Sequence, residues 1–282
     1  MISNLFKRSF NSRELLKSLQ NKVTIDTFEL DKLLLEAPEN LSVLNATIPR
    51  RDYHPKEDHI QERIHRSVWL DFKGFADPES NLSYTMPKED HFTKMMKGIN
   101  VRKGDMIVIY DKYRNISAPR TFFMMKCFGL QNVWLLNGTF EKWQREGRPI
   151  DRGESEDALR RVGRSPASSE DFDFKLDHSK IRVFDEMHAM VKAKESGSQN
   201  MPPMLDGRLS KYFERSHMPT TKSMPFSEVM DENYCFHPRE KMIEAFKRQA
   251  GIENPESDKI ILTCQRGITA CIIDFALKTL GN

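Results

Sequence analysis

Cys264 is the residue best placed for chemistry, because it directly follows an apolar run and opens a short loop. The run 259–263 is typical of a buried strand, and residues 269–280 are predicted to form a helix. The residues that join the strand to the start of the helix are Gln265, Arg266, Gly267, Ile268 and Thr269. A loop that curls into a helix N-terminus directs several backbone N–H groups at one point, which makes it an anion-binding site.

A cysteine at the mouth of such a loop has a stabilised thiolate and is a candidate nucleophile. Arg266 adds a fixed positive charge that could hold an anionic substrate. The pattern therefore favours attack on a substrate that carries both sulfur and negative charge. The alternative for Cys264, on this local pattern alone, is a buried structural cysteine at a strand end.

The other three cysteines are Cys127, Cys235 and Cys271, and all four are widely spaced. A disulfide framework is not expected in a long chain with so few cysteines, and no spacing matches a zinc site. We expect these three thiols to be inert. No metal and no cofactor is expected either, since the sequence has no P-loop and no glycine-rich dinucleotide motif.

The composition predicts a globular protein with a strongly charged surface. The length of 282 residues is typical of one large domain or two domains of ordinary size. Hydrophobic residues make up 38% of the sequence, sufficient for a core, and charged residues make up 30%. The net charge of +3 arises from 44 basic and 41 acidic residues, so nucleic-acid binding is not indicated. No apolar stretch approaches the ~20 residues of a transmembrane helix.

Strand-like and helix-like segments alternate along the chain, which predicts mainly parallel sheets flanked by helices. We expect a basic N-terminal segment (1–22), a first domain (23–150), a polar linker (151–180) and a second domain (181–282). Residues 52–66 are expected to be a charged loop, and residues 178–194 to contain a strand and a helix. The two halves repeat the same order of elements, with Asp111 at the place of Cys264.

Four stretches together resemble the tandem-domain rhodanese family, which includes thiosulfate and 3-mercaptopyruvate sulfurtransferases. They are Ser117-Ala-Pro-Arg120, Asn137-Gly-Thr-Phe-Glu-Lys-Trp143, Ser216-His-Met-Pro-Thr-Thr-Lys-Ser-Met-Pro-Phe226 and Thr263-Cys-Gln-Arg-Gly-Ile-Thr-Ala270. The stretches occur in both halves, so the resemblance extends from about Val23 to the end of the sequence. It implies two rhodanese-like domains, of which the second carries the reaction centre.

The resemblance implies that Cys264 takes the outer sulfur of a donor as a persulfide and passes it to a thiol or cyanide acceptor. Residues 265–269 match the loop whose amides stabilise the persulfide. The position of Arg266 is cationic in thiosulfate-preferring members, so thiosulfate is the expected small anionic donor. The substrate-binding arginine of the family aligns with Lys211, which keeps the charge but loses the planar fork of a guanidinium.

The sequence departs from the family in three further places. Thr220 replaces a glycine, and Arg63-Ile-His-Arg66 stands where the family has a Pro–Gly turn. The sequence ends at Gly281-Asn282, so we expect a second domain truncated at its C-terminus, possible protein partners covering the gap, and bare apolar surface there. These departures leave open an alternative: a catalytically weakened, rhodanese-like structural subunit of a larger, membrane-associated mitochondrial complex.

The first thirteen residues are basic and contain no acidic side chain, and Leu5, Phe6 and Phe10 could share one helical face. These features are typical of a mitochondrial targeting segment, and a mitochondrial location is therefore predicted. The other interpretation of this segment is an amphipathic helix on the protein surface.

Overall fold

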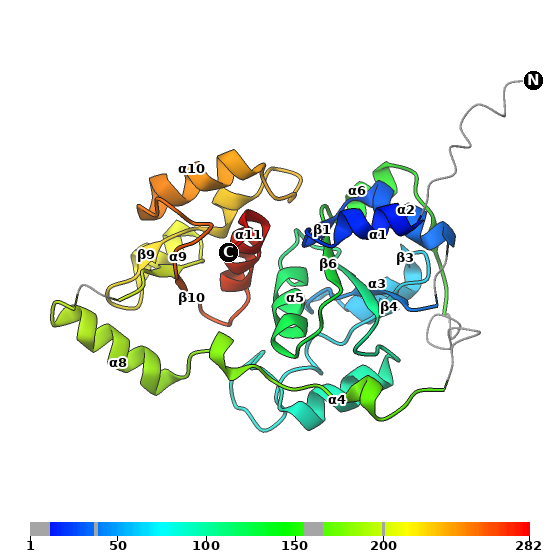
Figure 1. Ribbon diagram of the computed structural model, residues 1–282, viewed down its shortest axis with the longest axis horizontal. Coiled ribbons are helices and arrows are strands. Elements are labelled where there is room, and N and C mark those ends of the chain that lie inside the picture. The colour runs from blue at the N-terminus through cyan, green and yellow to red at the C-terminus, as the bar shows by residue number, and fades with distance from the viewer. Residues whose placement is uncertain (1–11, 37–38, 155–165, 199–200) are drawn as a thin grey trace, which may run out of the picture.

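The computed structural model describes residues 12–36, 39–154, 166–198 and 201–282. They form two α/β halves, each built on its own parallel sheet (Figure 1). Among the described residues, no helix is both long and apolar enough to cross a membrane. The predicted fold class is confirmed.

The first half contains a five-stranded sheet in the order β1-β6-β5-β2-β4, with parallel neighbours. Its strands are β1 (Thr24–Ile25), β2 (Leu41–Asn45), β4 (Val68–Trp69), β5 (Met106–Tyr110) and β6 (Val133–Leu136). Its helices are α1 (Ser12–Leu19), α2 (Thr27–Glu36), α3 (Pro55–Gln61), α4 (Glu89–Gly98), α5 (Ala118–Cys127) and α6 (Phe140–Arg145). A separate antiparallel pair joins β3 (Arg63–Ile64) to β7 (Ile150–Asp151).

The second half contains a three-stranded parallel sheet in the order β10-β8-β9. Its strands are β8 (Met204–Asp206), β9 (Lys222–Ser223) and β10 (Ile261–Thr263). Its helices are α8 (Phe184–Glu195), α9 (Ser210–Arg215), α10 (Arg239–Ala250) and α11 (Thr269–Leu280), with a short 3-10 turn η3 (Phe226–Val229). Two further 3-10 turns, η1 (Glu170–Phe172) and η2 (His178–Lys180), lie in the segment that connects the halves.

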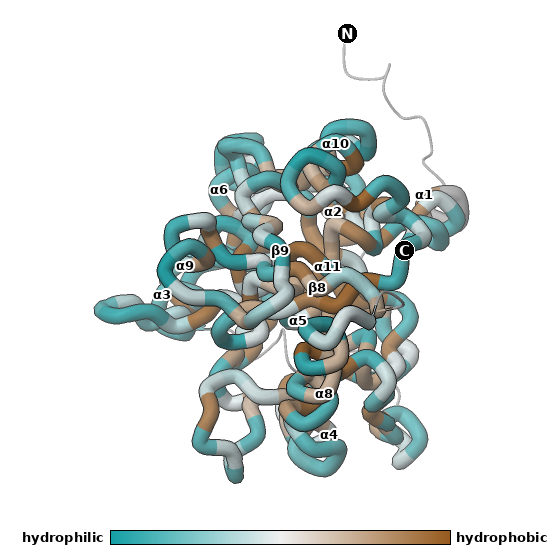
Figure 2. The backbone as a smooth tube through the Cα atoms, turned by 90° about the vertical axis from the view of Figure 1, so that its left-hand side faces the viewer, coloured by the Kyte–Doolittle hydropathy of each residue, from teal (hydrophilic) through white to brown (hydrophobic). Residues whose placement is uncertain are grey.

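The two halves share one hydrophobic core, which lies between α5 and α11. Phe122 of α5 meets Phe275 of α11 edge to face, with ring centroids 4.8 Å apart. Hydrophobic stretches gather around β8 and α11 in Figure 2. The first sheet has a second core on its other face, closed by α1, α2 and α6. Helix α11 is therefore held against the first half. The loop of residues 264–268, which leads into α11, is held in place by the same packing.

Residues 52–66 are not simply a charged loop, because they contain α3 and β3. Pro55 occupies the first turn of α3, where its missing N–H is not needed, and two acidic residues follow it in that turn. The expectation of a loop was wrong because charge alone does not exclude a short helix.

The strand expected within residues 178–194 is also not found, since Ile181 to Val183 leads directly into α8. The counterpart of this segment in the first half is β1, which obtains its backbone partners from β6. Among the described residues the second sheet has no strand beyond β10, so residues 181–183 have no neighbour to pair with. A strand forms only where a partner supplies hydrogen bonds.

Part of the segment expected to be a linker packs on the first half. Phe172 and Phe174 are buried, and the ring of Phe174 lies edge to face on Phe92 of α4, with centroids 5.1 Å apart. Asp151 is part of β7. Residues 155–165 lie outside the described residues, as do residues 1–11 of the predicted targeting segment.

Candidate functional site

Cys264 lies at the carboxyl end of β10, immediately before the loop that leads into α11. Its side chain is half-buried, while Gln265, Arg266 and Gly267 are exposed. Ile268 is buried and anchors the loop to the core. Gly267 has φ +67, a left-handed conformation that a side chain would disfavour. The structure thus brings the predicted loop residues together at the start of α11.

The end of β8 holds the neighbouring side of this loop in place. The N–H of Gly207 donates to the carbonyl of Thr263 over 2.9 Å, one residue before the cysteine. A Cβ at position 207 would lie 2.8 Å from the backbone carbonyl oxygen of Thr269, which is too close for any side chain. Glycine at this position therefore lets β8 approach the start of α11 and fixes the distance between the two elements.

Arg208 is a functional candidate that the sequence analysis did not single out. Its guanidinium forms a bidentate contact with Asp206, with Nη2 2.6 Å from Oδ2, and it also donates to the carbonyl of Ser216 over 2.8 Å. The pKa of Arg208 is raised, chiefly by Asp206 and further by negative charge at Cys264. Arg208 therefore lies within electrostatic reach of the cysteine. The sequence feature that could have identified Arg208 is its position two residues after Asp206, the last residue of a strand.

Lys211, the predicted substrate-binding cation, is exposed on α9. Its ammonium lies over the ring of Tyr212, 5.1 Å from the centroid.

The remaining thiols differ from Cys264 in their surroundings. Cys127 and Cys271 are buried, and burial raises the pKa of both. Cys271 donates to the carbonyl of Gly267 over 3.2 Å and so supports the loop from inside α11. Burial also raises the pKa of Cys235. A raised pKa disfavours the reactive thiolate, in keeping with the expectation that these residues are inert.

The equivalent loop of the first half is filled by the carboxylate of Asp111, which is fully buried. Its Oδ1 accepts from the N–H groups of Tyr113 and Asn115 over 2.9 and 3.0 Å. Its Oδ2 accepts from the N–H groups of Ser117 and Ala118 over 2.8 and 2.9 Å. A loop of this shape, between a parallel strand and a helix, therefore surrounds a small anion with amide donors.

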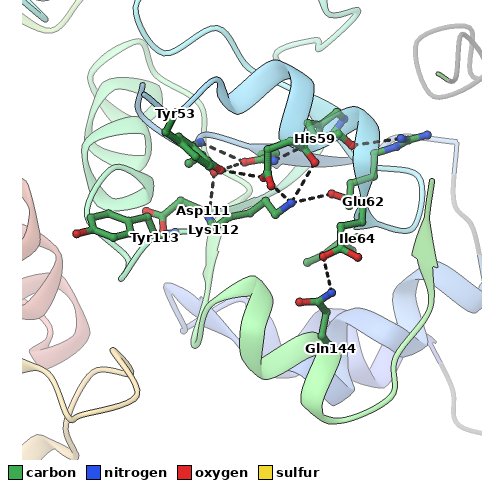
Figure 3. Close-up of polar contacts among 12 residues, drawn as sticks. Tyr53, His59, Glu62, Ile64, Asp111, Lys112, Tyr113 and Gln144 are labelled. Atoms are coloured by element: carbon green, nitrogen blue, oxygen red, sulfur yellow. Dashed lines mark hydrogen bonds and ion pairs between the residues drawn. The ribbon is translucent and has the colours of Figure 1, made fainter. Parts of the chain in front are cut away.

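Several side chains around this first loop form a network of hydrogen bonds and ion pairs, as Figure 3 shows. Lys112 pairs with Asp58 and also donates to the backbone carbonyl of Glu62 over 2.9 Å. The hydroxyl of Tyr53 donates to the same aspartate over 2.8 Å. The first half thus has a carboxylate and an internal ion pair where the second half has a thiol.

His59 belongs to this buried network and should make the stability of the fold sensitive to acid. Its Nδ1 lies 3.1 Å from the amide of Asn45, and burial, with Arg63 and Lys112 nearby, lowers its pKa to about 3. The unfolded chain takes up a proton near pH 6.5, whereas the folded chain does not, so stability falls as the pH drops from 6.5 towards 3. Between pH 7 and pH 5 we expect a loss of about 2 kcal/mol from this group.

Urea unfolding at pH 7 and at pH 5 gives the loss of unfolding free energy on acidification for the wild type and for His59→Gln. The difference between these two losses is the contribution of His59. Glutamine keeps a polar side chain but does not titrate, so the variant should lose less stability than the wild type on acidification. Equal losses in the two proteins would contradict the interpretation.

Known proteins resemble this chain in sequence across both of its halves. Residues 44–146 match the model of the rhodanese-like domain, a range that extends from β2 to α6 and excludes Cys264. The chain is 27% identical to thiosulfate sulfurtransferase of Gallus gallus over 251 residues, covering 86% of this chain and 81% of that protein. It is 24% identical to thiosulfate/3-mercaptopyruvate sulfurtransferase 2 of Arabidopsis thaliana over 262 residues, covering 86% and 75%.

Two solved structures share the arrangement of both halves. One is SseA from Escherichia coli, described as having the rhodanese fold of 3-mercaptopyruvate sulfotransferases, with a TM-score of 0.78, 20% identity and coverage of 92% and 94%. The other is described as the yeast mitochondrial complex I sub-stoichiometric sulfur transferase subunit, with a TM-score of 0.73, 23% identity and coverage of 92% and 90%. At these identities the two structures establish the fold.

Proposed function

Because the chain belongs to the tandem-domain rhodanese family, we propose that it is a sulfurtransferase in which Cys264 carries the transferred sulfur as a persulfide. The observation that carries this proposal is the equivalence of Cys264 and Asp111, two residues at the mouth of matching strand–loop–helix units. The oxygen of an aspartate and the outer sulfur of a cysteine persulfide are both two bonds from Cβ. The amides that surround Asp111 therefore indicate where the amides of residues 265–269 stabilise a persulfide anion.

The proposed reaction has two displacement steps. In the first, the thiolate of Cys264 attacks the outer sulfur of thiosulfate; the S–S bond breaks and its electron pair leaves with sulfite. In the second, a thiolate or cyanide attacks the outer sulfur of the persulfide, and the thiolate of Cys264 is the leaving group. Charge is conserved in each step, and neither step needs an external oxidant or reductant.

Two arginines favour an anionic donor of this kind. Arg266 lies exposed in the loop, two residues after the nucleophile, and Arg208 lies at the end of the neighbouring strand. The exposed guanidinium of Arg266 can hold two oxygens of a sulfonate-like group at once, which suits thiosulfate. In Arg208, Nε and Nη2 already donate to Asp206 and Ser216, so this residue would contribute through Nη1. We therefore propose thiosulfate as the preferred donor over 3-mercaptopyruvate, with Arg208 taking the part that the sequence analysis assigned to Lys211.

The experiment that tests this proposal is mass spectrometry of the protein after incubation with thiosulfate and removal of the excess donor. We expect one added sulfur atom on the peptide that contains Cys264, and its loss on addition of cyanide. An Arg208→Gln variant should form the persulfide about 10–100-fold more slowly, the loss expected for one charge-assisted contact. Glutamine at this position can still donate to Asp206, which limits disturbance of the fold.

The matched control is Lys211→Gln, which removes a positive charge three residues further along and should leave the rate nearly unchanged. Absence of the persulfide in the wild-type protein with either donor would overturn the proposed function. A larger effect at Lys211 than at Arg208 would overturn the assignment of the binding cation.

The second candidate function is a rhodanese-like structural subunit of a mitochondrial complex. The likeness to the yeast complex I sulfur transferase subunit favours it, as do two strained backbone positions. Thr220 has φ +66 and Arg66 has φ +61, conformations that favour glycine. We also propose a mitochondrial location, because the yeast complex I subunit and thiosulfate/3-mercaptopyruvate sulfurtransferase 1 of Arabidopsis thaliana are both described as mitochondrial. Co-purification in a stoichiometric complex, without persulfide formation, would favour this candidate.

A further inference from the structure

Cys271 is buried in the first turn of α11 and contacts the loop of residues 264–268 from the side of the core. Its Sγ donates a hydrogen bond to the carbonyl oxygen of Gly267 over 3.2 Å, and its backbone N–H donates to the carbonyl of Ile268 over 3.1 Å. Burial raises the pKa of the Cys271 thiol, so the proton that the first of these bonds requires stays on the sulfur. The thiol is therefore a lasting link between α11 and the loop.

The hydrogen bond from Cys271 sets the direction of the peptide unit that joins Gly267 to Ile268. In a trans peptide the carbonyl and the N–H point in opposite directions. The carbonyl of Gly267 points along α11 towards Cys271, so the N–H of Ile268 points out of the N-terminal end of the helix. N–H groups in this position stabilise an anion, and the sulfur of Cys264 carries its negative charge at the start of the same loop.

This peptide unit needs a contact that holds it, because it follows a glycine. Gly267 has φ +67, and glycine accepts many backbone conformations, so the peptide after it can rotate as a unit at low cost. Rotation would direct the carbonyl oxygen of Gly267 towards Cys264, where it would repel negative charge on the sulfur. The buried side chain of Ile268 fixes the position of the loop in the core, whereas the thiol of Cys271 fixes the direction of the peptide.

The corresponding loop of the first half is held in a different way. Its Ser-Ala pair at residues 117–118 stands where the second half has Thr-Ala at residues 269–270, so Pro119 takes the place of Cys271 and has no side-chain donor. There the carboxylate of Asp111 is a permanent part of the protein and holds four N–H groups itself. In the second half the anion belongs to a reacting sulfur, so a separate contact has to keep the loop ready for it.

From these contacts we propose that Cys271 is a positioning residue for the nucleophile, whose thiol directs the N–H of Ile268 at the sulfur of Cys264. The inference rests on the proposed function, because it concerns the negative charge that Cys264 carries as a thiolate and as a persulfide. Cys271→Ala removes the hydrogen bond to Gly267. Cys271→Ser retains it, since a serine hydroxyl in a helix donates to the carbonyl four residues earlier.

Alkylation of Cys264 by iodoacetamide tests the proposal without requiring sulfur transfer. Trypsin cleaves after Lys259 and Arg266, so mass spectrometry detects Cys264 and Cys271 on separate peptides. At pH 7 we expect Cys264 to react about threefold to tenfold more slowly in Cys271→Ala than in the wild type, the effect of one hydrogen bond. At about pH 9.5, where an ordinary cysteine is ionised, it should be no slower. Cys271→Ser should follow the wild type at both pH values.

The rate of persulfide formation from thiosulfate gives a second measurement. Cys271→Ala should lower the limiting rate by a similar factor and leave the thiosulfate concentration at half-maximal rate unchanged, because the N–H of Ile268 faces the nucleophile. Cys271→Val also lacks a donor but fills the space of the thiol, so it should behave as Cys271→Ala does. The matched control is Cys127→Ala, which removes a buried thiol at the end of α5 and should leave both measurements unchanged.

The proposal would be overturned if Cys264 reacted as fast at pH 7 in Cys271→Ala and Cys271→Val as in the wild type. A serine variant no faster than the alanine variant would also overturn it, as would an equal loss in Cys127→Ala. A wild type that forms no persulfide, yet shows the expected order of alkylation rates, would overturn the proposed function and support the positioning of the loop by Cys271.

Discussion

Replacement of Cys264 by serine is expected to lower kcat/KM for sulfur transfer by at least about 10³-fold, because the reaction has no other group to hold the sulfur. A serine hydroxyl remains protonated at neutral pH and forms no persulfide. Cys264 is half-buried at the end of β10, so the smaller side chain should be accommodated with little change in thermal stability. Thiocyanate formation from thiosulfate and cyanide gives the activity, and circular dichroism on heating gives the stability.

Cys235→Ser is the matched control, since Cys235 is also half-buried but burial raises its pKa. It should retain full activity. Substantial activity in Cys264→Ser, or an equal loss in Cys235→Ser, would contradict the assignment of the nucleophile. Cys264→Asp adds a second control that comes from the internal repeat, because it gives the second loop the side chain of Asp111. That variant should be inactive but folded.

The parts of the fold that the sequence predicts well are those that the shared core determines. The continuous apolar run of β5 is typical of a strand buried on both faces, as observed, and the helix predicted at residues 269–280 is α11. Both elements are surrounded by other parts of the chain, so their hydrophobic patterns are continuous and unambiguous. The position of Cys264 in a strand–loop–helix unit followed from the apolar run 259–263, which is β10, and from the helical pattern of α11.

The parts that were missed depend on which elements become neighbours, and local patterns do not contain that information. The run at β10 was predicted as a buried strand, but β10 is a half-buried edge because pairing on its outer side is absent from the described residues. Residues 181–183 did not become a strand for the same reason. Arg208 was passed over because its coupling to Cys264 arises only when β8 lies beside β10.

Removal of the Asp111 carboxylate should have the largest effect on the stability of the fold. In Asp111→Ala the four N–H groups of residues 113, 115, 117 and 118 lose their acceptor inside a buried loop. An unpaired buried amide costs about 1–3 kcal/mol, and water can reach some of the four, so we expect a loss of about 3–5 kcal/mol in the free energy of unfolding. Urea unfolding monitored by tryptophan fluorescence measures it. The exposed carboxylate of Glu214 provides the control, and Glu214→Ala should change stability by less than about 0.5 kcal/mol.

Asp111→Asn tests whether the loop requires an anion or only a side chain of that shape. The amide oxygen of asparagine can replace Oδ1 and accept from Tyr113 and Asn115, but its NH2 group then faces the N–H groups of Ser117 and Ala118. Because donors would oppose donors, this isosteric variant should lose more than half as much stability as Asp111→Ala. Near-wild-type stability of Asp111→Asn would mean that the loop does not select for negative charge. It would thereby also weaken the argument, drawn from the equivalent loop, that the amides after Cys264 stabilise a persulfide anion.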